Sequence, residues 1–486
     1  MNQQLEQELL SSWQERQEYA EQMQPLLGKL YRNRAVEISV YGRSLLGASA
    51  IDIIKAHRSV RLKESNKLRL RESWPLLAHL SQMALAPAHI DLGKLAYAYH
   101  YDPRYKALSL ADYLQQQLGS IVNRNDERAC QDVVLYGFGR IGRILARLLI
   151  ERQGTQNKLR LKAIVVRGGQ AGDLEKRASL LRRDSVHGPF NGSITVDKER
   201  NAIKANGSYI QVIYANSPLE VDYQQYGIED AIVVDNTGIW RDSEGLSQHY
   251  LSKGVKKILL TAPGKGEIKN IVYGVNHLDI GPHDSLISAA SCTTNAITPV
   301  LKAIDEHFGI DSGHVETVHS FTNDQNLIDN FHKGERRGRS AALNMVITET
   351  GAATAVAKAY PPLQGKLTGS AIRVPTPNVS LAILNLHLKQ SSDKQTLNHY
   401  LRDISLFSPL QQQIDYTAST EIVSSDLVGT RAPAVIDSQA TIVAGARATL
   451  YVWYDNEFGY SCQVMRVLQK MAGLESPTLP AASLSL

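Results

Sequence analysis

A cysteine stands in the run Ser291-Cys292-Thr293-Thr294-Asn295, after an apolar stretch over 286–290 and before a segment whose apolar residues recur at helical spacing. The pattern predicts a thiol at the point where a strand ends and a helix begins. A sulfur atom there faces unpaired backbone N–H groups and the positive end of the helix dipole, and both favour the thiolate. Cys292 could therefore act as a nucleophile toward an electrophilic carbon, while the alternative is a buried structural cysteine.

A glycine-rich turn, Gly137-Phe138-Gly139-Arg140-Ile141-Gly142, lies between a predicted strand over 133–136 and a predicted helix over 144–150. With a second predicted strand over 159–166, the turn falls inside a βαβ unit, where its glycines would let a pyrophosphate approach the helix amino terminus. Such patterns also occur by chance, but the flanking strand and helix favour a dinucleotide site. Further predicted strands, which indicate an α/β sheet, cover 210–214, 231–235 and 257–260.

The segment before residue 129 differs in character, because its apolar residues fall on single helical faces among many charged and amide side chains. These residues are Leu5, Leu9, Trp13 and Ala20 near the start, and Leu110, Leu114 and Leu118 near the end. The segment is therefore predicted to be helical. A basic stretch from Arg58 to Arg71 could suggest polyanion binding, but Glu64 and Glu72 interrupt it, which favours a solvated helix face.

The whole chain has the composition of a globular protein, with 43% hydrophobic and 21% charged residues. Its 486 residues are too many for one ordinary core and indicate two or three domains. A net charge of +5 could help to attract phosphorylated metabolites but makes no case for nucleic acid.

Only three cysteines occur, Cys130, Cys292 and Cys462, so no disulfide framework is expected and a reducing, cytoplasmic compartment fits. The polar amino terminus argues against a secretory signal. No uninterrupted apolar run is long enough to span a bilayer, so no membrane association is expected.

With these motifs taken together, the chain from about Val133 to about Ala472 resembles the phosphorylating glyceraldehyde-3-phosphate dehydrogenases. The segment before it lies outside the resemblance. The matching motifs occur in order and are Asp184-Ser185-Val186-His187-Gly188, Asn236-Thr237-Gly238, Thr261-Ala262-Pro263, the Cys292 run, Thr317-Val318-His319-Ser320, the loop 323–339, Thr350-Gly351-Ala352-Ala353, 373–380 and 453–461.

The resemblance implies that Cys292 adds to an aldehyde to form a thiohemiacetal and that His319 takes the hydroxyl proton as hydride leaves for NAD or NADP. Inorganic phosphate would then cleave the resulting thioester. By resemblance the substrate is glyceraldehyde 3-phosphate, no metal is needed, and the assembly is a homotetramer. Whether the amino-terminal extension permits that tetramer stays open.

The resemblance also assigns binding residues. The expected cofactor residues are Gly137, Gly139, Arg140, Ile141, Gly142, Arg167, Thr237, Gly238, Thr261, Asn456 and Tyr460. The substrate's phosphate would be held by Thr322, Asp324 and Arg373, and the attacking phosphate by Ser291, Thr293, Arg337, Thr350 and Gly351. Asp324 fits this set poorly, because a carboxylate repels phosphate. Asn456 is expected to orient the nicotinamide carboxamide.

The chain departs from NAD-specific members after the second strand, where an acidic residue usually binds the ribose 2′-hydroxyl. Here the stretch is Val166-Arg167-Gly168-Gly169-Gln170, and the first carboxylate is Asp173. The segments 216–218 and 330–331 also depart from the family pattern. We hypothesise that NADP is accepted, alone or alongside NAD; the alternative is that a loop of altered length offers Asp173 or another group to the ribose.

Two rival functions remain. Asp329-Asn330-Phe331-His332 leans toward an erythrose-4-phosphate dehydrogenase, whereas Thr350-Gly351 favours the phosphorolytic enzyme. The amino-terminal helices could instead mark an interaction or RNA-binding protein with an inactive site, although no RNA motif is present.

The expected fold is an α/β Rossmann dinucleotide-binding domain and an α+β catalytic domain, preceded by a mainly α-helical extension. The expected bounds are 1–128 for the extension, 129–290 for the NAD(P)-binding domain and 291–455 for the catalytic domain. The final segment, 456–486, should supply a helix that returns to the Rossmann domain.

Overall fold

The computed structural model describes residues 2–152, 154, 156–168 and 170–484, and these fall into two compact units. The first unit comprises Met1–Ala129, Gly154–Asn157 and Ser476–Ser485, and the second comprises Cys130–Gln153 and Lys158–Glu475. All predicted site residues lie in the described part. Gly169, in the stretch that departs from the NAD-specific pattern, lies outside it.

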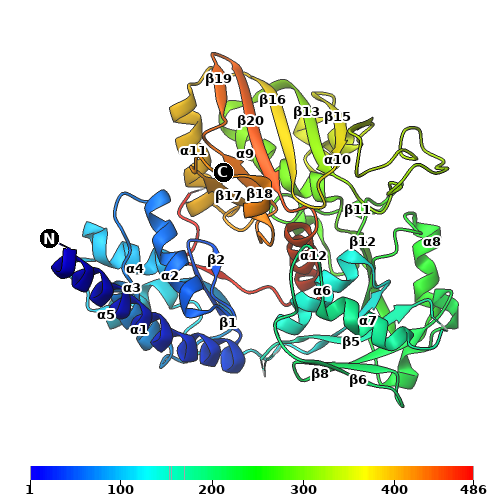
Figure 1. Cartoon of the computed structure of the whole chain (residues 1–486), viewed down its shortest axis with the longest axis horizontal. Helices are drawn as coiled ribbons and strands as arrows, with labels where there is room; N and C mark the ends of the chain where they lie inside the picture. The colour runs from blue at the N-terminus through cyan, green and yellow to red at the C-terminus, as the bar shows by residue number, and fades with distance from the viewer. Residues whose placement is uncertain (1, 153, 155, 169, 485–486) are drawn as a thin grey trace. The chain divides into compact units, whose positions relative to one another are not determined.

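The first unit is mainly helical, as expected, and also contains a small sheet that the sequence pattern does not indicate. Its helices are α1 (Asn2–Arg34), α2 (Ala50–Ser59), α3 (Leu70–Leu80), α4 (Leu92–Tyr101) and α5 (Leu110–Leu118), with 3-10 turns at Val60–Leu62 and Pro103–Tyr105 (Figure 1). The sheet has the order β2 (Arg43–Ser44), β1 (Val36–Val40), β3 (Ala88–Asp91), β21 (Thr478–Leu479).

The helix α1 contributes to the core of this unit only through its second half. Ala20, Met23, Leu27 and Leu30 are buried at helical spacing, whereas the expected apolar residues Leu5, Leu9 and Trp13 are exposed. Helical periodicity identifies a face but not whether another element covers it. Leu5, Leu9, Trp13 and Ala20 are expected to lie on one helical face, and of these four only Ala20 is buried.

The dinucleotide-binding half of the second unit is a sheet covered by helices, as predicted. Its strands are β4 (Gln131–Tyr136), β5 (Leu159–Val166), β6 (Ile194–Asp197), β7 (Ala202–Ala205), β8 (Ser208–Tyr214), β9 (Ala231–Asp235), β10 (Val255–Leu260), β11 (Lys269–Asn270) and β12 (Leu286–Ser288). Their order is β11-β12-β10-β9-β4-β5-β8-β7-β6, parallel except for the antiparallel pairs of β7 with β6 and β8. The helices are α6 (Arg140–Glu151), α7 (Asp173–Arg182) and α8 (Ser243–Ser247), with 3-10 turns at Pro218–Glu220, Tyr223–Tyr226, Gln248–Leu251 and His277–Asp279.

The catalytic half is built on a second, mixed sheet. Its strands are β13 (Ile310–Ser320), β14 (Val346–Thr348), β15 (Leu367–Val374), β16 (Ser380–Leu388), β17 (Ile414–Thr417), β18 (Ala434–Asp437), β19 (Ile442–Ala444) and β20 (Arg447–Tyr454). The order is β14-β15-β13-β16-β20-β18-β17, with β19 on β20. The helices are α9 (Cys292–Phe308), α10 (Ala352–Ala359) and α11 (Lys394–Phe407), with 3-10 turns at Pro361–Leu363 and Ser424–Leu427.

The helix α12 (Phe458–Met471) packs into the dinucleotide-binding half, where Val464, Met465 and Leu468 share a core with Leu145 and Leu149 of α6. The chain then leaves this unit, and β21 pairs in parallel with β3 of the first unit. We keep the bounds 1–128, 129–290, 291–455 and 456–486 as a proposal. Among the described helices, none combines the length and apolar character needed to cross a membrane.

Candidate active site

Cys292 is the first residue of α9, so the strand-to-helix position predicted for the thiol is present. Ser291 precedes it as the N-cap, and its hydroxyl oxygen accepts a hydrogen bond from Thr294 N at 3.1 Å. Ala290 has a positive φ of 56°, an uncommon conformation for a residue with a side chain, at the turn from β12 into the helix. The half-buried sulfur thereby lies at the amino end of α9.

His319, at the end of β13, lies beside this sulfur. Its Nε2 is 3.5 Å from Cys292 Sγ, and its Nδ1 is 2.7 Å from Ser320 O. When Nδ1 carries the proton, it donates to this carbonyl and leaves the Nε2 lone pair facing the sulfur. The pair can then move a proton between sulfur and nitrogen, as a nucleophile and its general base must.

Arg373 is placed next to the same pair by strand register, because β13 and β15 are parallel and His319 pairs with Arg373. Its Nη1 donates to Ser320 O at 3.1 Å and lies 2.8 Å from His319 Nδ1. Nδ1 accepts from this guanidinium only in the tautomer that carries the ring proton on Nε2; when Nδ1 is protonated, Arg373 and His319 both donate to Ser320 O. In the described part of the chain Arg373 forms no ion pair. A largely buried cation without a carboxylate partner costs stability, so this site favours an anion.

Burial and Arg373 control the protonation of the pair. Burial, and after it the positive charge of Arg373, together lower the pKa of His319 to about 3. Burial also raises the pKa of the Cys292 thiol, while Arg373 and hydrogen bonds from Thr293 lower it. Burial therefore opposes the thiolate that the helix amino terminus is expected to favour, and a neutral imidazole faces the sulfur near pH 7.

Some of the residues expected to hold phosphate already interact with other protein side chains. Arg337 pairs with Asp324, so the carboxylate that fits the predicted phosphate set poorly has a cation as its partner. The Thr293 hydroxyl lies 3.0 Å from the Tyr454 hydroxyl, which also lies 2.6 Å from the Thr317 hydroxyl. These hydroxyls form a buried chain behind Cys292.

The other predicted phosphate residues lie at turns. Thr350 accepts a hydrogen bond from Ala352 N at 3.2 Å and, with Gly351, precedes the first turn of α10. Thr322 accepts from Gln325 N at 3.0 Å through its carbonyl and remains half-buried. Their roles toward phosphate stay predictions.

Asn456 and Tyr460 are buried beside the catalytic pair. Asn456 Oδ1 accepts from Ser380 Oγ at 2.9 Å, and Ser380 Oγ accepts from Ser320 N at 3.1 Å. This fixes the amide carbonyl and leaves the Asn456 NH₂ group to face a ligand. The Tyr460 hydroxyl donates to Ala290 O at 2.9 Å, which holds the turn that precedes Cys292.

The glycine-rich turn requires two of its glycines for steric reasons. A Cβ on Gly137, whose φ is 91°, would lie 3.0 Å from Thr237 Cγ2, and one on Gly142 would lie 2.4 Å from Gly137 O. Gly139 faces open space, which leaves room for a pyrophosphate at the start of α6. Ile141 is half-buried against the core.

The cofactor-side loops are held by one buried carboxylate. Asp235 accepts from Thr237 N at 2.8 Å and from Thr237 Oγ1 at 2.7 Å, and His249 lies 3.0 Å away on its other oxygen. Thr261 Oγ1 donates to Asp235 O at 3.0 Å. Gly238 follows with a positive φ of 65°. Thr237, Gly238 and Thr261 therefore form one connected edge of the site.

The side chain of Arg140, one of the residues expected to bind the cofactor, pairs with two protein carboxylates. Its Nε donates to Glu457 Oε1 at 2.8 Å and its Nη1 to Asp184 Oδ2 at 2.5 Å, while His187 Nε2 lies 2.9 Å from Glu457 Oε2. The guanidinium is thus paired by two carboxylates. The network joins the glycine-rich turn to the residue that follows Asn456.

Sequence reasoning gave no role to Asp184, His187 or Glu457. All three lie inside motifs that resemble those of the family, and this resemblance was the signal that could have identified them. Their proximity could not be inferred, because Arg140 and Glu457 are 317 residues apart in the chain.

A cavity of about 350 Å³ adjoins the glycine-rich turn and extends to the ends of β5 and β8. Arg167 and Arg177 line it, and no carboxylate does so among the described residues. Asp173 instead accepts from Arg177 Nε at 2.7 Å, and Arg177 also donates to Arg167 O at 2.6 Å. The alternative that Asp173 is offered to a ribose is therefore disfavoured by its pairing.

The described residues contain no group of three or more His, Cys, Asp and Glu side chains suited to a metal ion.

Two ranges of the chain match one protein family. Residues 131–243 match the family described as glyceraldehyde 3-phosphate dehydrogenase, NAD binding domain, and residues 291–456 match its C-terminal domain.

Individual relatives agree with the family match. A Pseudomonas aeruginosa protein named glyceraldehyde-3-phosphate dehydrogenase-like protein is 58% identical over 462 residues, which cover 94% of this chain and 100% of the relative. Glyceraldehyde-3-phosphate dehydrogenase 2 of Nostoc sp. is 39% identical over 343 residues, or 70% of this chain and 98% of the relative. The first match therefore includes most of the amino-terminal extension, whereas the second relative has a length that fits the second unit.

Replacing Arg373 by Met should slow the alkylation of Cys292 by iodoacetamide and move its pH transition upward. Arg373 lowers the pKa of the thiol, so its removal raises that pKa and reduces the thiolate fraction about tenfold for each pKa unit. Iodoacetamide is neutral and needs no anion site. Arg339→Met, in an exposed loop, is the control. An unchanged pH transition in Arg373→Met would contradict the role of its charge.

Replacing Glu457 by Gln should weaken binding of the dinucleotide about tenfold and lower kcat, because the ion pair that holds Arg140 of the glycine-rich turn to the residue after Asn456 is lost. The alkylation rate of Cys292 should not change. Glu151→Gln removes a similar ion pair, with Arg431, at the other end of α6 and serves as the control. Equal effects of the two substitutions on cofactor KM would show that Glu457 acts only on stability.

Proposed function

The chain belongs to the glyceraldehyde-3-phosphate dehydrogenase family, and we propose that it catalyses the reversible phosphorylating oxidation of glyceraldehyde 3-phosphate to 1,3-bisphosphoglycerate. As a member it is an oxidoreductase with an NAD-binding domain. The observation that carries the proposal is the 3.5 Å approach of Cys292 Sγ to His319 Nε2 beside the unpaired Arg373.

In the proposed reaction Cys292 Sγ bonds to the aldehyde carbon while its proton passes through His319 Nε2 to the carbonyl oxygen. This makes a thiohemiacetal. The nicotinamide of the cofactor supplies the hydride acceptor. His319 takes the hydroxyl proton as the hydride leaves, which produces a thioester on Cys292. An oxygen of inorganic phosphate then attacks the thioester carbon and releases the sulfur.

The low pKa of His319 keeps its imidazole neutral across the physiological range, so Nε2 can accept a proton without first losing one. The same low pKa makes the imidazole a weaker base than one with a pKa near 7. Arg373 would hold the phosphate of the substrate, and Arg337, oriented by Asp324, would hold the attacking phosphate together with Ser291, Thr293, Thr350 and Gly351. Asn456 would present its NH₂ group to the carboxamide of the cofactor.

The test is formation of reduced cofactor from glyceraldehyde 3-phosphate with and without inorganic phosphate. Turnover should require phosphate, and Cys292→Ser should lower kcat by ~10³ or more, because the nucleophile is lost. Cys130→Ser, at an exposed cysteine, is the control. Equal turnover without phosphate, or preference for erythrose 4-phosphate over the triose phosphate, would contradict the proposal.

We further propose that NADP is accepted. The cavity beside the glycine-rich turn is lined by two arginines and by no carboxylate among the described residues, an arrangement that favours a 2′-phosphate over a free ribose 2′-hydroxyl, which an acidic residue usually binds. Arg167 forms no ion pair in the described part of the chain, which leaves its guanidinium available.

Arg167→Ala should raise KM for NADP about tenfold and leave KM for NAD nearly unchanged, because a charge-assisted hydrogen bond to the 2′-phosphate is lost. Arg160→Ala, at the other end of β5, is the matched control. Steady-state kinetics with both cofactors measure the difference. A strong preference of the unmodified protein for NAD, or an equal change in both KM values, would contradict it.

A further inference from the structure

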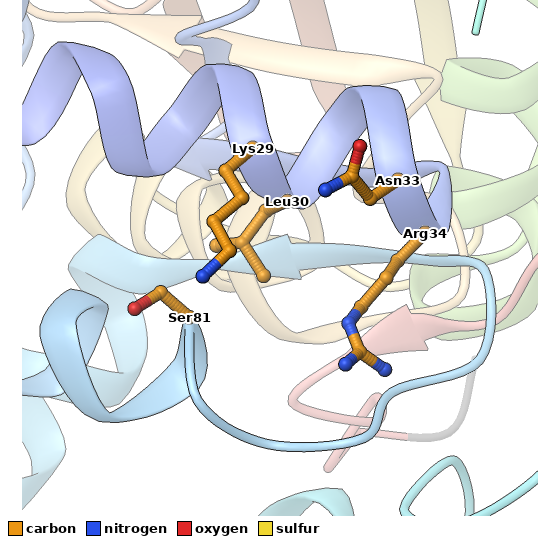
Figure 2. Close-up of a pocket in the computed structure, with 5 residues that line it drawn as sticks. All are labelled: Lys29, Leu30, Asn33, Arg34 and Ser81. Carbon is orange, nitrogen blue, oxygen red and sulfur yellow. The ribbon is translucent and has the colours of Figure 1, made fainter. Parts of the chain in front are cut away.

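A cavity of about 310 Å³ lies in the first unit, where the last turns of α1 meet the carboxyl end of α3. Its walls are Lys29, Leu30, Asn33 and Arg34 of α1 and Ser81, which caps α3. Figure 2 shows the Lys29 amino group beside the Ser81 hydroxyl, with the Arg34 guanidinium reaching down from the end of the helix. The proposed reaction makes no use of this cavity.

Three polar side chains of the cavity, those of Lys29, Asn33 and Arg34, have no partner among the described residues. In the part of the chain that the structure describes, Lys29 and Arg34 form no ion pair, and the Asn33 amide forms no hydrogen bond. Other cations of the same unit do find carboxylates: Arg69 lies 3.4 Å from Glu72, and Arg71 lies 3.6 Å from Glu15. Lys29 and Arg34 are thus two unneutralised charges that share a concave wall.

One alternative is that these cations only offset helix dipoles, because α1 and α3 both end at the cavity. Each carboxyl end carries about half a negative charge. Two such ends therefore amount to about one negative charge, whereas Lys29 and Arg34 supply two positive charges. The cavity keeps a positive potential after both dipoles are counted.

We propose that this cavity binds a small phosphate ester. Lys29 would donate as a point charge, Arg34 could pair with two phosphate oxygens, and the Asn33 amide would add a neutral donor. The Ser81 hydroxyl donates to Ala78 O at 2.7 Å, so its oxygen is left to accept from a ligand hydroxyl. Leu30, which is buried, supplies an apolar wall, and the volume suits a metabolite-sized molecule.

A ligand here would order a part of α1 against which another segment packs. A Cβ on Gly154 would lie 3.2 Å from Arg32 O, so the backbone at Gly154 is in close contact with the last turn of α1. Gly154 belongs to the connection between α6 and β5. Residues 26–35 and 78–84 contain the walls of the cavity, so a ligand bound there should slow the exchange of their amide hydrogens. This measurement does not depend on enzyme activity.

The experiment measures hydrogen–deuterium exchange in the full chain with glycerol 3-phosphate, inorganic phosphate, citrate or chloride at equal ionic strength. The variants are Lys29→Met/Arg34→Met and the control Lys55→Met/Arg58→Met, which removes the same charges from exposed positions of α2. Glycerol 3-phosphate should slow exchange in both segments of the unmodified protein and of the control. In the cavity variant the required concentration should rise about 100-fold, because two charge-assisted contacts are lost.

Equal protection in the cavity variant and in the control would overturn the proposal. Protection by citrate but not by glycerol 3-phosphate would overturn the assignment to a phosphate ester. Protection by inorganic phosphate alone would also overturn it, because the ligand would then be the free ion. No protection by any probe would also overturn it. Both variants should fold, because all four substituted positions are exposed or half-buried. Thermal unfolding of the two variants checks this.

Discussion

The parallel register of β13 and β15 places a guanidinium beside the imidazole that faces the reactive sulfur. Arg373 shares Ser320 O with His319, and its charge lowers the pKa of both His319 and Cys292. A shift of the register by one residue would turn either side chain to the opposite face of the sheet. The protonation of Cys292 and His319 and the position of Arg373 therefore depend on the same hydrogen bonds between β13 and β15.

The arginines around this site differ in the number of carboxylates that pair with them. We expect the paired ones to have structural roles and the unpaired ones to bind ligands. Arg140 is paired by Glu457 and Asp184, so it holds the glycine-rich turn against the start of α12. Arg337 has one carboxylate partner, Asp324, and keeps part of its charge for a ligand. Arg373 and Arg167 have no carboxylate partner in the described residues, which is the arrangement expected where a phosphate completes the pairing.

The extension shows that a helical pattern does not describe a whole unit. Its sheet joins β1 and β3, which are separated by two helices, to β21 near the carboxyl end of the chain. Asp91 stabilises this arrangement, since it accepts from Tyr41 N at 2.9 Å and from Gly42 N at 2.8 Å and also caps α4. The match to the Pseudomonas aeruginosa relative includes most of this extension, so most of it is shared by at least two proteins.

The local sequence was sufficient to predict the cysteine at a strand-to-helix boundary, the glycine-rich turn and the principal strands of the dinucleotide-binding half. Those features depend on side-chain periodicity and turn chemistry within a few residues. The distance between Cys292 and His319, the pairing of Arg140 with Glu457 and the cavity beside Lys29 depend on which distant segments meet. Periodicity shows which face of an element is apolar, but only packing decides what covers that face, as the exposed Leu5 and Leu9 demonstrate.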